Sequence, residues 1–190
     1  MKEEMKIRPA VKEDAAAAAR LLYDALHDVA HQLTGAESEQ EAVTVLEWFF
    51  RQEEGRLSYR QALVGEVEGE VAGIIVLYGG DEAEELDRPM IERLRALKKD
   101  PSITLDKEAA EDEFYIDTLS VAPRYGRRGI ASALMKAAGE RAKERGYGKI
   151  SLAVVTTNHG AHALYLRSGY IKDKEIMING NVYYHMVKQP

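Results

Sequence analysis

The sequence predicts a single α/β domain built around a mixed β-sheet. In some segments apolar residues recur every three or four positions, as on one face of a helix, whereas other segments are short apolar runs typical of strands. Turn signals separate them, and the clearest is Asn179-Gly180, which favours a β-hairpin. The chain has 190 residues, of which 45% are hydrophobic, so it can fill one packed core.

The first 60 residues predict one strand and two helices. Residues 6–8 have the pattern of a short strand. A long helix is expected over residues 13–33, because apolar side chains recur along one face and acidic residues suit its N-terminus. A second helix is expected over residues 39–53. Its aromatic residues are expected in the core, and a substrate-binding cage is the alternative: Trp48, Phe49 and Phe50.

The middle of the chain predicts a hairpin followed by an insertion. Residues 62–67 and 71–78 have strand character, and a short Glu-Gly-Glu link joins them. Residues 79–112 are strongly acidic and contain one charged helix. The apolar residues of that helix are Met90, Ile91, Leu94 and Leu97.

The last third of the chain alternates strands and helices. A strand is expected at residues 114–121, a helix at 129–145, a strand at 150–155, a short helix at 161–167, and two strands at 170–176 and 182–187. The complete order is strand, two helices, three strands, helix, strand, helix and two strands, which indicates an α/β fold.

Composition excludes several classes of protein. Cysteine is absent, which excludes a disulfide scaffold, a thiolate metal site and a cysteine nucleophile. No apolar run follows residues 1–6, so no signal peptide is expected. No stretch approaches the ~20 apolar residues of a membrane helix. We therefore expect a cytoplasmic protein with no membrane partner.

Charge is distributed unevenly along the chain. The net charge of −6 argues against nucleic acid as a partner. Residues 114–190, however, carry 12 Lys and Arg against 5 Asp and Glu, a net charge of +7. Such a region would attract a polyanion by its field. Charges dispersed over solvated faces would give the same count, so motifs have to decide between these interpretations.

A turn with two glycines, Gly126-Arg127-Arg128-Gly129-Ile130-Ala131, leads into the predicted helix at 129–145. The first N–H groups of a helix lack partners inside the helix and can bind a phosphate. Glycine lets the backbone approach such a ligand closely. The pattern is neither a P-loop nor a dinucleotide fingerprint, and by itself it also fits an ordinary turn.

In its context this turn resembles the GNAT superfamily of N-acetyltransferases. The family signature, Gln/Arg-x-x-Gly-x-Gly/Ala, follows a strand ending in Val-x-Pro, as does Val121-Ala122-Pro123. A second segment, residues 158–170, matches every fixed position of the family pattern Asn-x-x-Ala-x-x-Leu-Tyr-x-x-x-Gly-Phe/Tyr. One position departs: Gly126 replaces Gln or Arg, so main-chain amides are expected to supply most of the phosphate binding.

The resemblance implies a mostly antiparallel, twisted sheet flanked by helices, and acetyl-CoA as the acetyl donor. The backbone of residues 119–121 would pair with the pantetheine arm. Asn158 would hold the same arm or only cap its helix. The residues expected to bind the cofactor are Leu119, Ser120, Val121, Gly126, Arg127, Arg128, Gly129, Ile130, Ala131, Ser132, Asn158 and Tyr165.

The resemblance also implies catalytic roles for Tyr165 and Asp117. A phenol has a pKa of ~10, near the ~8.5 of a thiol, so Tyr165 could protonate the leaving thiolate; a packed aromatic side chain is the alternative. Asp117 could accept the amine proton or bind a cationic amine, although a carboxyl pKa of ~3.9 would have to rise or act through water. A purely structural aspartate is the alternative. Tyr115 and Asp117 are the expected substrate contacts. By strand alternation four residues share one face: Tyr115, Asp117, Leu119 and Val121.

The expected reaction is direct transfer of acetyl to a primary amine, preferably a small cationic one, in a ternary complex. The alternatives are a non-catalytic acyl-CoA sensor or interaction module, and a protein N-terminus or lysine as acceptor. The acidic insertion would be a lid that favours cationic amines, or a solvated helix. The five histidines show no metal-binding spacing, so no metal is expected. A homodimer stays an open possibility.

Overall fold

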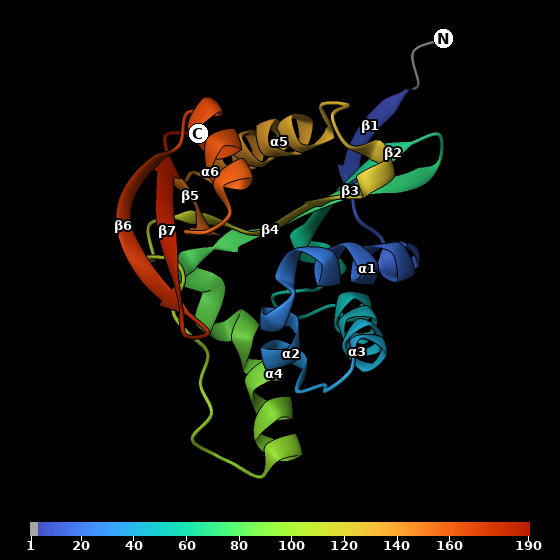
Figure 1. Ribbon diagram of the computed structural model, residues 1–190, viewed down its shortest axis with the longest axis vertical. Coiled ribbons are helices and arrows are strands. Elements are labelled where there is room, and N and C mark those ends of the chain that lie inside the picture. The colour runs from blue at the N-terminus through green and yellow to red at the C-terminus, as the bar shows by residue number, and fades with distance from the viewer. Residues whose placement is uncertain (1–3) are drawn as a thin grey trace.

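A sheet of seven strands, in the order β1-β2-β3-β4-β5-β7-β6, runs through the centre of the structure (Figure 1). The structure is a computed structural model that describes residues 4–190. Residues 1–3, which belong to the segment where no signal peptide is expected, lie outside the described residues. Only the β4–β5 pair is parallel. The prediction of an α/β fold with a mixed, mostly antiparallel sheet is confirmed.

The strands lie close to the predicted ranges. They are β1 (Met5–Pro9), β2 (Ala62–Val67), β3 (Glu70–Gly79), β4 (Phe114–Val121), β5 (Ile150–Val155), β6 (Ile171–Ile178) and β7 (Asn181–Lys188). Both predicted hairpin turns form, and Asn179 and Gly180 have the positive φ angles, 48° and 77°, that a tight hairpin turn requires.

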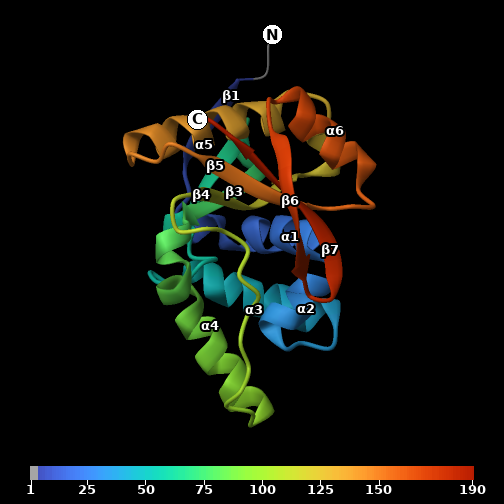
Figure 2. The same cartoon turned by 90° about the vertical axis from the view of Figure 1, so that its left-hand side faces the viewer.

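Helices cover both faces of the sheet. They are α1 (Ala15–Leu26), α2 (Asp28–Thr34), α3 (Glu39–Arg51), α4 (Ala83–Lys98), α5 (Ile130–Glu144) and α6 (His159–Arg167). Helices α5 and α6 lie on one face and α1 to α4 on the other (Figures 1 and 2). The alternation of β3 fills both cores, because Ile74 packs on the α1–α3 side and Ile75 on the α5 side.

The single helix expected over residues 13–33 is wrong, since the chain forms two helices there. His27 adopts φ 46° and ψ −116°, which an α-helix does not accommodate, so α1 ends before it and α2 begins after it. Leu22, Val29 and Leu33 are buried on both sides of the break. Apolar spacing is therefore preserved across it, and periodicity could not reveal it.

The insertion at residues 79–112 belongs to the packed structure. Met90 and Leu94 of α4 are buried in the same core as α1 and α3. The chain then returns past these helices to β4 (Figure 2). One predicted core residue lies outside, since Trp48 is 53% exposed; Leu97 of α4 is also exposed. No helix among the described residues is long and apolar enough to cross a bilayer.

Candidate active site

The parallel strands β4 and β5 diverge and open a fork in the sheet. They pair only at residues 114–116 and 150–152, after which the β4 backbone has no strand partner on the side of β5. A cavity of about 450 Å³ lies at this fork. Its lining includes Tyr115, Asp117 and Leu119 of β4, Val154 of β5, Asn158 and Tyr165 near α6, His27 and Asp28 at the α1–α2 break, and Tyr183 of β7.

A bulge in β4 changes which side chains face this cavity. In the β3–β4 register Val76 pairs with Thr118 and Leu77 with Ile116, so Asp117 is the extra residue. Tyr115 packs beside Tyr78, whereas Leu119 and Val121 pack in the core under α5. The prediction that all four alternate residues share one face is therefore wrong, because the extra residue reverses the alternation after Asp117.

The loop before α5 adopts the geometry of an anion-binding helix start. Gly129 is the N-cap of α5 with φ 81°, and its missing side chain leaves the first amides of the helix without a side-chain cap. Arg127 also has a positive φ, 62°. Gly126, by contrast, has φ −58°, which any residue can adopt, so the glycine requirement of this loop lies at Gly129.

Basic side chains surround the loop, but they are not equivalent. Arg124 pairs with Glu70 at 2.7 Å, and its guanidinium lies 4.8 Å from the centre of the Tyr125 ring. Arg128 also lies over that ring, at 5.4 Å. Arg127 is exposed. Three arginines and the positive end of α5 therefore gather in the loop that follows β4.

Three residues of the second motif line the cavity at the fork: Asn158, Ala161 and Tyr165. Tyr165 projects from α6 into the cavity, and its ring lies edge-on to Tyr170 with 6.2 Å between ring centres. Burial raises the pKa of Tyr165 to about 12, so its phenol stays protonated at neutral pH. The side chain of Asn158 accepts a hydrogen bond from the Ala161 amide at 3.1 Å, which makes it the N-cap of α6.

Asp117 is tied into a buried ion cluster. Its carboxylate accepts hydrogen bonds from Arg56, from the Tyr78 hydroxyl at 2.8 Å and from the Thr118 hydroxyl at 2.8 Å. Its side chain is 1% exposed. Arg56 precedes β2 and also contacts Asp87 at 3.3 Å and Glu108 at 3.1 Å. One guanidinium thus lies among three carboxylates.

The charges of this cluster shift several pKa values. Although burial opposes its charge, Asp117 and the neighbouring acids hold the pKa of Arg56 well above its ordinary value. Burial raises the pKa of Glu108 and of Asp87, and Arg56 opposes the rise. Because three acids share one cation, protonating one of them costs less free energy than protonating an isolated carboxyl on the surface.

Neither Arg56 nor Glu108 was predicted from the sequence as a site residue. The available signal was Asp117 itself, since a carboxylate inside a buried strand requires a cation or donors from elsewhere in the fold. Nothing in the sequence showed which basic residue this was, because Arg56 lies 61 residues away in a loop.

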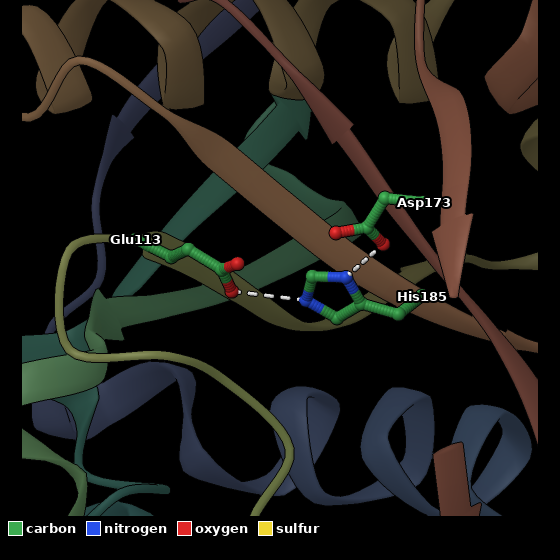
Figure 3. A group of neighbouring side chains, drawn as sticks. All are labelled: Glu113, Asp173 and His185. Atoms are coloured by element: carbon green, nitrogen blue, oxygen red, sulfur yellow. Dashed lines mark hydrogen bonds and ion pairs between the residues drawn. The ribbon is translucent and has the colours of Figure 1, made fainter. Parts of the chain in front are cut away.

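A second, partly buried cluster joins Glu113, just before β4, to Asp173 of β6 and His185 of β7 (Figure 3); Glu113 and His185 are buried and Asp173 is exposed. His185 Nε2 is 2.9 Å from Glu113, and Nδ1 is 2.5 Å from Asp173. The Ser151 hydroxyl and the Ala110 amide also donate to Glu113. The possible ligand atoms lie within 4.8 Å of one another. The two ring nitrogens nevertheless face opposite carboxylates, an arrangement that suits an imidazolium between two acids better than one shared ion.

The model of the acetyltransferase (GNAT) family matches residues 21–170 of this chain. The fork between β4 and β5 agrees with this match. No functionally curated protein matches the sequence.

Solved structures cover nearly the whole chain. A protein described as an acetyltransferase is 33% identical, with 97% of this chain and 98% of that chain covered and a TM-score of 0.80. An N-acetyltransferase from Staphylococcus aureus Mu50 is 29% identical, with coverages of 96% and 100% and a TM-score of 0.82. The PaiA N-acetyltransferase of Thermoplasma acidophilum, solved with coenzyme A, is 15% identical, covers 98% and 99%, and shares the fold at a TM-score of 0.58.

Proposed function

The chain belongs to the acetyltransferase (GNAT) family and is an acyltransferase, and from this premise we propose that it moves acetyl from acetyl-CoA to a small cationic primary amine. The observation that carries the proposal is the fork between β4 and β5, whose cavity joins Tyr165 on one side to a group of carboxylates on the other. A thioester held at the fork would lie between these two groups.

The cofactor end of the proposal rests on backbone geometry. The free edge of β4 at residues 117–121 can pair with the amides of the pantetheine arm as an added strand would. The pyrophosphate would accept hydrogen bonds from the first amides of α5, at the loop with Gly129 and Arg127. Asn158, as the N-cap of α6, would position the helix that carries Tyr165.

The acceptor end of the proposal rests on charge and enclosure. Four carboxylates line the cavity, and Arg56 is the basic side chain among them: Asp24, Asp28, Glu108 and Asp117. This excess of acid would attract a cation. The tip of the β6–β7 hairpin also lines the cavity through Ile178 and Asn181, across from the α1–α2 break. An acceptor space bounded from both sides favours a small amine over a protein chain.

The chemistry requires a neutral amine, a polarised thioester and a stabilised leaving group. The amine nitrogen attacks the carbonyl carbon, the C–N bond forms and the C–S bond breaks. A β4 amide can donate to the carbonyl oxygen as negative charge develops there. The phenol of Tyr165, held protonated, can donate its hydrogen to the departing sulfur.

An amine-dependent thiol-release assay tests this proposal. The protein is incubated with acetyl-CoA and a panel of monoamines, diamines, polyamines, amino acids and short peptides, and the acetylated product is identified by mass. We expect release with cationic amines, and a kcat about 100-fold lower in Tyr165→Phe. Saturable acetyl-CoA binding without release for any amine would instead identify a non-catalytic acyl-CoA sensor. Release with peptides alone would show that the acceptor is a protein.

A further inference from the structure

Glu108 lies where the insertion returns to the catalytic fork. It belongs to the stretch between α4 and β4, and its side chain is 12% exposed. Its carboxylate contacts Arg56 at 3.1 Å and hydrogen bonds with Tyr115. It lines the central cavity, and it also lines an outer hollow of about 500 Å³ between residues 107–112 and the β6 side chains Lys174 and Ile176. Glu108 is therefore the side chain shared by the reaction cavity and this outer hollow.

The three carboxylates around Arg56 are not equivalent as proton acceptors. Asp117 already accepts hydrogen bonds from three side chains and is the most buried of the three. Protonating it would break several of these contacts. Asp87 contacts Arg56 but does not line the central cavity. Glu108 lines the cavity, and its contacts with Arg56 and Tyr115 leave acceptor capacity on a carboxylate with two oxygens.

We propose that Glu108 is the catalytic base of the transfer, the group that takes the proton from the ammonium form of the acceptor amine; this inference rests on the proposed function. The proton moves from the amine nitrogen to the Glu108 carboxylate, and the neutral amine then attacks the thioester carbon. The second proton lost by that nitrogen balances the one that the thiolate gains when the C–S bond breaks. Glu108 releases its own proton to solvent through the outer hollow.

Charged and titratable groups on every neighbouring element bear on Glu108. Burial raises the pKa of Glu108, Arg56 lowers it, and Asp117 on β4 raises it again. The other groups are Asp87 on α4, Tyr78 on β3, Tyr115 on β4 and Tyr183 on β7. Asp28 at the start of α2 lines the same cavity, and the outer hollow adds Lys174 on β6 and Lys107, Glu111 and Asp112 of the same loop. The net effect is a carboxylate closer to neutrality than a surface glutamate, as a base that operates near pH 7 requires.

The role of base has a pH signature that a purely structural role lacks. Glu108→Gln is isosteric, and it removes one negative charge from a site with a surplus of carboxylates, so the variant is expected to fold and to bind acetyl-CoA as the wild type does. We expect kcat to fall about 100-fold at neutral pH. The difference in kcat between the wild type and Glu108→Gln should shrink as the pH approaches the pKa of the amine. At that pH much of the amine is already neutral and has no proton to give to a base.

The experiment compares pH profiles of kcat and kcat/KM for the wild type, Glu108→Gln, Glu108→Asp and Asp87→Asn, with the best amine from the panel. In the wild type, kcat should fall on the acid side of the profile as the base becomes protonated; this fall is the acid limb. Loss of the acid limb in Glu108→Gln and its retention in Asp87→Asn support the inference. Glu108→Asp keeps a carboxylate at a changed distance, so it should retain the limb with a reduced kcat. It also provides the test if the glutamine variant does not fold.

Two results would overturn this inference alone. In one, the wild type is active and Glu108→Gln keeps its kcat and its acid limb. In the other, Glu108→Gln raises only KM, which would make Glu108 a group that holds the cation without accepting its proton. A wild type with no amine-dependent turnover would overturn the proposed function itself, so the two failures can be distinguished.

Discussion

The two ends of the proposed site are built in different ways. The proposed cofactor end consists of backbone from short, contiguous segments: the β4 edge, the loop at Gly129 and the start of α6. The proposed acceptor end consists of side chains brought together across the fold, with Arg56 joining Asp87, Glu108 and Asp117. The first depends on local conformation, and the second depends on a correctly assembled core. Substitutions should therefore damage the two ends in different ways.

Replacing Arg56 is the strongest test of this difference. The guanidinium is 3% exposed, and Arg56→Leu would leave three carboxylates facing one another without a cation. Removing one partner from a buried group of ion pairs costs about 3–5 kcal/mol of unfolding free energy. The loss, measured by urea denaturation, should shrink at lower pH, because protonation then neutralises the stranded acids.

Arg60→Leu is the matched control for Arg56→Leu. Arg60 lies four residues away and pairs with Glu53 on the surface, where both side chains are more than half exposed. Its loss should change the urea midpoint little. Equal midpoints for the two variants would show that the acceptor end does not depend on the buried cluster.

The difference between the two ends also explains what the sequence could predict. Hydrophobic period and turn residues gave the strands within a few residues, and the two motifs located the Gly129 loop and Tyr165. They did so because each motif is a short stretch of chain, and the role proposed for it depends on local conformation. The ion cluster could not be found in this way, since Arg56 and Asp117 are 61 positions apart. The His27 break was missed because the apolar spacing continues across it. The bulge at Asp117 does shift the apolar positions, from Phe114 and Ile116 to Leu119 and Val121, but the prediction assumed an unbroken alternation along β4.

Gly129→Val tests the cofactor end. A Cβ at Gly129 would meet no atom within 4 Å, so the fold has room for it, but φ 81° is strained for a β-branched residue. We expect at least tenfold weaker acetyl-CoA binding by calorimetry, because the loop must leave this conformation or place a side chain against the phosphates.

Gly146→Val separates backbone strain from the loss of phosphate binding. Gly146 has φ 80° and equally open surroundings, but it follows the opposite end of α5. It should show a similar loss of stability, of about 1–3 kcal/mol, with normal affinity for acetyl-CoA. If both variants bound acetyl-CoA equally well, the loop before α5 would not be the pyrophosphate site.

His185 predicts a pH dependence of stability. Burial opposes its charge, but Glu113 and Asp173 raise its pKa above the ordinary value of 6.5. The imidazolium therefore contributes stability fully below pH ~6.5, and this contribution is lost as the pH rises through the raised pKa. The unfolding free energy of the wild type minus that of His185→Gln should be larger at pH 6 than at pH 9, by about 1.5–3 kcal/mol if one charged hydrogen bond is lost.

The partner carboxylate titrates in the opposite sense. The pKa of Glu113 is lowered to about 2 by His185 and Ser151 against the effect of burial, so its contribution is lost only as the pH falls from 4.5 toward 2. Glu113 also accepts from the Ala110 amide, at the turn that carries the chain from Glu108 into β4. His185→Gln should thus raise KM for the amine and leave acetyl-CoA affinity unchanged. The reverse pattern would show that the cluster supports the cofactor end.

Replacing Trp48 is expected to have the smallest effect of these substitutions, because this residue lies at the outer limit of the proposed acceptor end. It is half exposed beside a second cavity of about 350 Å³ between α3 and α4, which Phe49 and Met90 also line. Arg56 lines both cavities, but its charged group is held by acids on the side of the fork. Trp48→Ala should therefore change the unfolding free energy by less than about 1 kcal/mol and leave KM for the amine unchanged. A shift in that KM, with stability intact, would mean that the packing on the outer side of Arg56 controls where its carboxylates point, and that the acceptor end extends through the ion cluster to α3.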